Sequence, residues 1–133
     1  MIDSRRAHIM GAVGEYVFWL AYGCDKPEHN PFGDGGHGDA VFPNGKTASV
    51  KATLHADPHF VPNPQRPFID DYGALIRLNQ SRDHQILGVV NQSYWQEHHF
   101  LRDFGRGFGP QPVIHWRDMQ DPDEFRNIIW RQT

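Results

Sequence analysis

Residues 38–54, GDAVFPNGKTASVKATL, contain two strand-like runs on either side of the pair Asn44-Gly45. An Asn-Gly pair between apolar and β-branched runs is a strong signal for a hairpin turn. In the second run, small or apolar residues at even positions alternate with polar residues at odd positions. This alternation puts Ser49 and Lys51 on the face that points away from the core. The stretch therefore predicts a β-hairpin with one buried face.

The segments around this hairpin predict an α/β fold in which helices flank a small mixed β-sheet. Residues 4–22 predict a helix that begins at Ser4 and stops at Gly23. We expect Gly11 and Gly14 to let this helix pack closely against the sheet. Its apolar positions at helical spacing are Ile9, Val13, Val17 and Leu20.

The second half of the chain predicts further strands and a closing helix. We expect an irregular loop over 55–68, a short helix over 70–78, strands within 84–93, 98–105 and 113–119, and a last helix over 123–132. The chain has 133 residues, which fits one domain over 1–133.

The composition narrows the class of protein. The formal charge is −3, with ten arginines and three lysines, which excludes a strongly basic protein that coats nucleic acid. A single cysteine, Cys24, cannot form an internal disulfide, and we expect it to be a small apolar residue near a helix end. No apolar run is long enough to span a membrane and no signal peptide is visible, so we expect a cytoplasmic protein that contacts no membrane.

Two carboxylates and a lysine lie in or near the predicted hairpin. Glu15 lies in the first predicted helix, Asp39 ends the glycine-rich run GDGGHGD at 33–39, and Lys51 lies on the returning strand. Carboxylate oxygens suit Mg²⁺, and a metal ion with a nearby lysine can promote phosphodiester hydrolysis. The alternative is that Glu15 is a solvent-facing helical residue, Asp39 only begins a strand, and Lys51 is a solvated strand lysine.

This pattern resembles the PD-(D/E)xK nuclease superfamily, which has a restriction-endonuclease-like core. The matching motifs are "GxxGE" at Gly11, Gly14 and Glu15, the Gly-rich run that ends at Asp39, and "SVK" at 49–51. The resemblance covers residues 8–53 and implies a nuclease that uses Mg²⁺ or Mn²⁺, with Glu15 and Asp39 as metal ligands and Lys51 as a catalytic residue. It further implies a DNA substrate rather than RNA, a homodimer, and a bacterial or phage source.

The chain departs from this family at Ser49, where the family has Asp or Glu. A serine hydroxyl is a neutral and poor ligand for Mg²⁺. Asp34 or Glu15 could replace the missing carboxylate, a water could bridge Ser49 to the ion, and His37 is a further supporting candidate. The site could otherwise be inactive, which leaves a degenerate nuclease fold that binds DNA or a protein partner without cleavage.

Other residues are candidates for binding. Arginines contact phosphates well, and the four that we single out are Arg77, Arg82, Arg102 and Arg106. Zinc is a further candidate ligand, because histidines occur as the pairs His55/His59 and His98/His99. Two features argue against a zinc site: HADPH contains a proline, and the sequence has no Cys pair. A third alternative is an unrelated α/β binding module.

Overall fold

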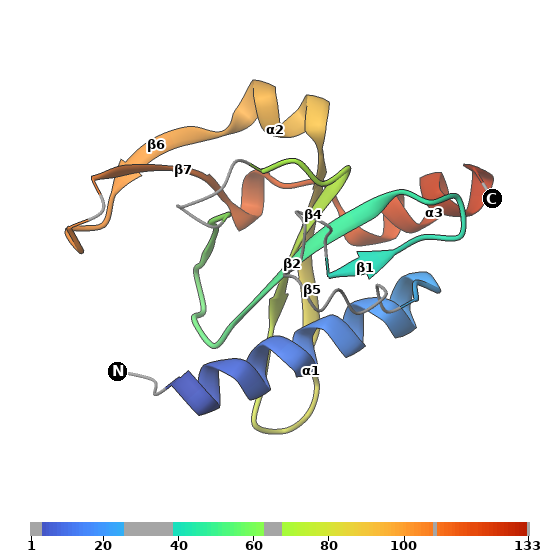
Figure 1. Ribbon diagram of the computed structural model, residues 1–133, viewed down its shortest axis with the longest axis horizontal. Helices are drawn as coiled ribbons and strands as arrows, with labels where there is room; N and C mark the ends of the chain where they lie inside the picture. Colours follow the sequence, from blue (N-terminus) through green and yellow to red (C-terminus); the bar gives the residue numbers. More distant parts are fainter. Residues whose placement is uncertain (1–3, 26–38, 63–67, 108, 133) are drawn as a thin grey trace, which may run out of the picture.

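The computed structural model describes residues 4–25, 39–62, 68–107 and 109–132, and Figure 1 shows how its elements are arranged. Over these residues the chain forms three helices, one 3-10 turn and seven strands. In chain order they are α1 (Ser4–Tyr22), β1 (Ala40–Val41), β2 (Thr47–Thr53), β3 (His59–Phe60), β4 (Tyr72–Arg77), β5 (Gln85–Asn91), α2 (Gln92–His98), β6 (Phe100–Asp103), β7 (Pro110–His115), η1 (Trp116–Asp118) and α3 (Pro122–Gln132).

The strands form two small sheets. The first has the order β1-β2-β4-β5, in which β2 and β4 run parallel and the other neighbours run antiparallel. The second has the order β3-β7-β6 and is antiparallel throughout. The mixed α/β fold predicted from the sequence is therefore confirmed, although the sequence indicated one sheet and the structure has two.

The first sheet is packed on both faces. On one face, Phe18 of α1 and Phe125 of α3 join Ala48 and Val50 of β2 in a buried cluster. On the other face, Leu75 of β4 belongs to a second cluster, which includes residues of β3, β7 and α2. Figure 1 shows α1 along one side of this sheet and the β6–β7 ribbon extending away from it on the other side.

The predicted helix and hairpin are confirmed, with one correction to the helix. The hairpin pairs Ala40 with Ala48, and Gly45 in its turn has a φ of +87° that favours glycine. Gly23, with a φ of +67°, follows the last residue of α1. Ile9 and Leu20 of α1 are 58% and 67% exposed, so the predicted apolar face was wrong at both of its ends. Its buried positions are instead Gly14, Phe18 and Tyr22, with Met10, Val13, Val17, Trp19 and Ala21 partly buried beside them.

The short helix predicted over 70–78 is wrong, because the segment is strand β4. Tyr72 to Ile76 are all buried, since β4 lies between β2 and β5 with both faces covered. A strand buried on both faces lacks the alternation that identifies most strands in a sequence. The sequence also gave no signal for α2 or for the two-residue strand β3.

Among the described residues, no helix is both long and apolar enough to cross a bilayer.

Candidate functional site

A pocket of about 390 Å³ lies where β1 stops pairing with the edge of β2. We call it the β2-edge pocket. Residues from α1, from the start of β1 and from β2 line it: Ala7, Met10, Gly11, Glu15, Asp39, Val50, Lys51 and Ala52. The structure therefore brings together the three residues that the sequence singled out for catalysis, which are Glu15, Asp39 and Lys51.

Asp39 is held in place by the hairpin. Its backbone N–H donates to the carbonyl of Ala48 at 2.7 Å, and its Oδ2 accepts from the N–H of Val50 at 2.8 Å. The carboxylate therefore takes the place of a strand carbonyl just before β1, which begins at Ala40 and is two residues long. Among the described residues, Oδ1 has no hydrogen-bond donor, so this oxygen can accept a ligand.

The first helix positions Glu15 beside Asp39 through Trp19. The indole Nε1 of Trp19 donates to the carbonyl of Asp39 at 2.8 Å. Because Trp19 follows Glu15 by four residues, both side chains lie on one face of α1. Gly14 brings this helix close to β2, since a Cβ at Gly14 would lie 2.8 Å from the Cβ of Ala52. The prediction of close packing is confirmed for Gly14, whereas a Cβ at Gly11 would meet no heavy atom within 4 Å.

Lys51 lies on β2 between two residues that face α1. Val50 and Ala52 belong to the cluster beneath α1, so alternation directs Ser49 and Lys51 toward the opposite face. Among the described residues, β1 pairs with β2 only at Thr47 and Ala48, and Lys51 lines the pocket at the edge of β2 beyond these pairs. Ser49 is partly buried and does not line the pocket.

The donor atoms of the pocket suit a hard divalent cation. Glu15 and Asp39 supply carboxylate oxygens, and Mg²⁺ is commonly held by one or two carboxylates together with waters and substrate phosphate. Within residues 4–25, 39–62, 68–107 and 109–132, no group of three or more His, Cys, Asp or Glu side chains could hold a metal ion. Two carboxylates with substrate phosphate and water are a donor set that Mg²⁺ accepts.

Two supporting candidates, Asp34 and His37, lie outside the described residues.

Cys24 was predicted to be a small apolar residue rather than a reactive thiol. Its burial raises the pKa of the thiol to about 12, which agrees with that prediction.

The arginines predicted to bind phosphate lie in different surroundings. Arg77 donates to the carbonyl of Ala56 at 3.2 Å and to Oε1 of Gln85, so it supports the loop that precedes β3. Arg82 is exposed in the turn between β4 and β5, with a φ of +65°. Arg106 and Arg102 line a second hollow, described below.

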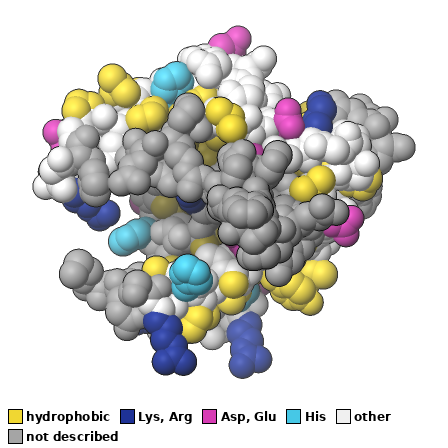
Figure 2. Space-filling model, viewed as in Figure 1, with side chains coloured by type: hydrophobic (Ala, Val, Ile, Leu, Met, Phe, Trp, Pro, Cys, Tyr) yellow, Lys and Arg dark blue, Asp and Glu magenta, His cyan; other side chains and the backbone are white. Residues whose placement is uncertain are grey.

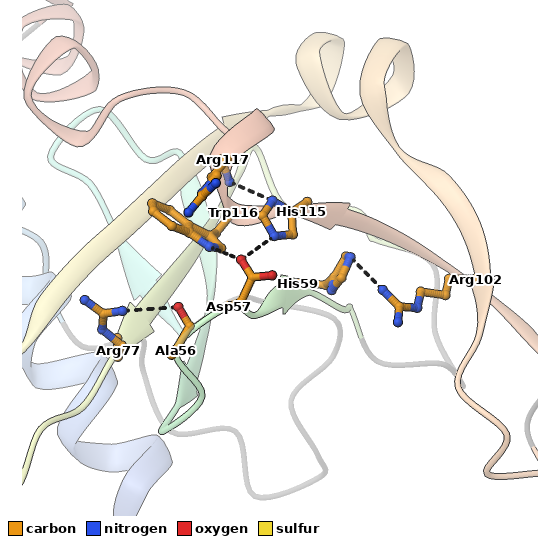
Figure 3. Close-up of polar contacts among 8 residues, drawn as sticks. All are labelled: Ala56, Asp57, His59, Arg77, Arg102, His115, Trp116 and Arg117. Carbon is orange, nitrogen blue, oxygen red and sulfur yellow. Dashed lines mark hydrogen bonds and ion pairs between the residues drawn. The ribbon is translucent and has the colours of Figure 1, made fainter.

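Sequence reasoning missed a polar cluster around Asp57, which Figure 3 shows. Asp57 Oδ1 accepts from His115 Nε2 at 2.7 Å and from Trp116 Nε1 at 2.8 Å. These hydrogen bonds hold the pKa of the Asp57 carboxyl below its ordinary value. The partners are almost 60 positions apart in the chain, so no local pattern marks them, and the only sequence signal was the pair of histidines at 55 and 59.

The sequence matches no model of a known protein family, and a search of curated proteins found no significant match.

Proposed function

We propose that this chain is a metal-dependent nuclease with a restriction-endonuclease-like core that hydrolyses phosphodiester bonds in nucleic acid. One observation carries the proposal. Glu15, Asp39 and Lys51, which come from a helix, a loop and a strand, line one pocket at the edge of β2. We expect DNA rather than RNA as the substrate, and a homodimer as the assembly that grips it.

Each of the three residues has a distinct role in this proposal. Glu15 and Asp39 would hold Mg²⁺ or Mn²⁺, which when bound polarises a phosphate and lowers the pKa of water. The N–H of Val50 holds Oδ2 of Asp39, and Asp39 lines the pocket. Lys51 would orient the attacking water and offset the negative charge that develops on the phosphate.

A second function is a protein of the same fold that binds nucleic acid or a protein partner without cleavage. The observation that favours it is Ser49, which stands where the nuclease family has an acid and does not line the pocket. The two functions differ in one measurable respect, since only the nuclease converts its substrate to product.

Cleavage of supercoiled and single-stranded DNA with Mg²⁺ or Mn²⁺ tests the nuclease. We expect Lys51→Ala and Asp39→Asn each to slow cleavage by about 100-fold or more, the usual range for loss of one group that stabilises developing charge. Asp39→Asn keeps an oxygen that can accept from Val50, so its effect reports the lost charge rather than a lost backbone contact.

Lys46→Ala is the matched control, because Lys46 is exposed in the hairpin turn and outside the pocket. It should leave the cleavage rate within about twofold of wild type. A folded wild-type protein that cuts none of these substrates would contradict the nuclease and favour the non-cleaving protein. Cleavage that persists in both pocket variants would show that activity resides elsewhere.

A further inference from the structure

A second hollow, of about 600 Å³, lies between the loop after β2 and the β6–β7 ribbon. We call it the β6–β7 groove. Figure 2 shows basic and histidine side chains beside a hollow on the left of the molecule, below the place where Figure 1 shows this ribbon. Its lining residues include Thr53, His55, Asp57, His59, Arg102, Phe104 and Arg106.

The groove is cationic although the chain as a whole is acidic. Arg102 and Arg106 line it, and among the described residues neither arginine forms an ion pair. Asp57 is the single acid among the lining residues of the described chain. Its Oδ1 is turned toward the donors of His115 and Trp116, as Figure 3 shows, so part of its charge is already balanced.

His59 holds Arg102 in a fixed orientation. The Nε2 of His59 lies 3.2 Å from a guanidinium nitrogen of Arg102. Because arginine can only donate, His59 accepts through Nε2 and is neutral, with its proton on Nδ1. The Arg102 guanidinium also lies 5.0 Å from the centre of the Phe104 ring. Among the described residues, His59 is the one hydrogen-bond partner of the Arg102 guanidinium, which carries five N–H groups.

The groove and the β2-edge pocket meet along one strand. Lys51 lines the pocket and Thr53 lines the groove. These residues lie two positions apart on β2, on the same face and about 7 Å from each other. A strand bound in both hollows would follow β2 from Lys51 to Thr53.

We propose that the β6–β7 groove binds the sugar-phosphate backbone of a single nucleic-acid strand whose next phosphate lies in the β2-edge pocket. This inference rests on the proposed nuclease function. Arg102 and Arg106 would each contact phosphate oxygens, and Phe104 offers an aromatic surface to a base or sugar. A hollow of about 600 Å³ is of the size that holds small molecules, which suits a nucleotide of a single strand.

Fluorescence anisotropy of a labelled oligothymidylate, measured in EDTA, tests the groove without cleavage. We expect Arg102→Ala and Arg106→Ala each to raise Kd about tenfold. Each should also reduce the slope of log Kd against log salt by about 0.7, the value for one phosphate contact to a single strand. Circular dichroism verifies that both variants are folded, and Arg106 is exposed, so its loss should not disturb the core.

Lys46→Ala is the control, because it removes one positive charge that is exposed outside both hollows. It should leave Kd within about twofold, and a larger loss would assign part of the strand path to the hairpin turn and overturn the groove as the main contact. Unchanged Kd and slope in both groove variants would likewise overturn the inference. Equal or tighter binding of a duplex, weakened in the same variants, would overturn the assignment to a single strand.

The two proposals fail in different ways. Groove-dependent binding by a protein that never cleaves DNA would contradict the nuclease while supporting the groove as a strand-binding surface. Metal-dependent cleavage by a protein whose affinity does not depend on Arg102 or Arg106 would support the nuclease and overturn the groove.

Discussion

The β2-edge pocket and the β6–β7 groove share strand β2 and differ in construction and in charge. The described residues that line the pocket come from α1, the start of β1 and β2, and they include two carboxylates and one lysine. Those that line the groove come from the end of β2, the loop after it, β3 and the β6–β7 ribbon, and they include two arginines, two histidines and one carboxylate. Packing of α1 on the first sheet forms the pocket, whereas the second sheet and its connections form the groove.

In the proposed function, reaction and binding are assigned to separate hollows. Carboxylates attract a divalent cation, whereas unpaired arginines attract phosphate. A substitution in one hollow should therefore alter one property and leave the other nearly intact. The remaining predictions test whether the two hollows are as different in packing and electrostatics as their geometry indicates.

The largest effect is expected beneath the pocket, where α1 is closest to β2. Gly14→Ala places a methyl group 2.8 Å from the Cβ of Ala52, so the free energy of unfolding should fall by about 1–3 kcal/mol. Gly11→Ala meets no atom within 4 Å, so it should leave stability unchanged or raise it by up to about 1 kcal/mol through helix propensity. Urea denaturation of both variants measures the difference.

A glycine beside the groove completes this comparison. Gly107 has a φ of +86° and open space around it, so Gly107→Ala should cost about 1 kcal/mol through backbone strain alone. Equal losses for Gly11→Ala and Gly14→Ala would contradict the close packing of α1 on β2.

A smaller effect is expected from the hydrogen bond that closes the hairpin edge. Asp39→Ala leaves the N–H of Val50 without its 2.8 Å acceptor, so unfolding free energy should fall by about 1–2 kcal/mol. Asp39→Asn retains an acceptor oxygen, so its free energy of unfolding should fall by less. If both variants lose the same stability, the side chain of Asp39 does not support the strand edge in the way the geometry indicates.

The smallest effect is expected at His59 in the groove. Burial lowers the pKa of His59 below its ordinary value of 6.5, and the Arg102 charge lowers it further. The unfolded chain therefore holds more protons in the window just below pH 6.5, so the contribution of His59 to stability falls as the pH falls through that window. NMR titration of the imidazole should show the lowered midpoint, and Arg102→Gln should raise it. A midpoint at or above 6.5 in the wild type would contradict the contact between the two side chains.

The sequence predicted most of the pocket and little of the groove, for physical reasons. The hairpin, the helix over 4–22 and the residues Glu15, Asp39 and Lys51 all depend on local signals, such as the Asn-Gly turn and strand alternation. The apolar face of the helix was wrong at Ile9 and Leu20 because helical spacing alone does not say which side a sheet will cover.

The groove depends on contacts between distant segments. The partners of Asp57 lie in β7 and η1, almost 60 positions along the chain. The sequence did indicate that Arg102 and Arg106 could contact phosphate, but nothing local pairs Arg102 with His59.

The rate of DNA cleavage as a function of Mn²⁺ concentration tests the central claim most directly. The account predicts that Asp39→Asn raises the Mn²⁺ concentration at half-maximal rate, because a metal ligand loses its charge. It predicts that Lys51→Ala lowers the maximal rate while the half-maximal concentration stays within about threefold of wild type. A wild-type rate that does not depend on the metal, or an unchanged Mn²⁺ dependence in Asp39→Asn, would contradict the assignment of the pocket.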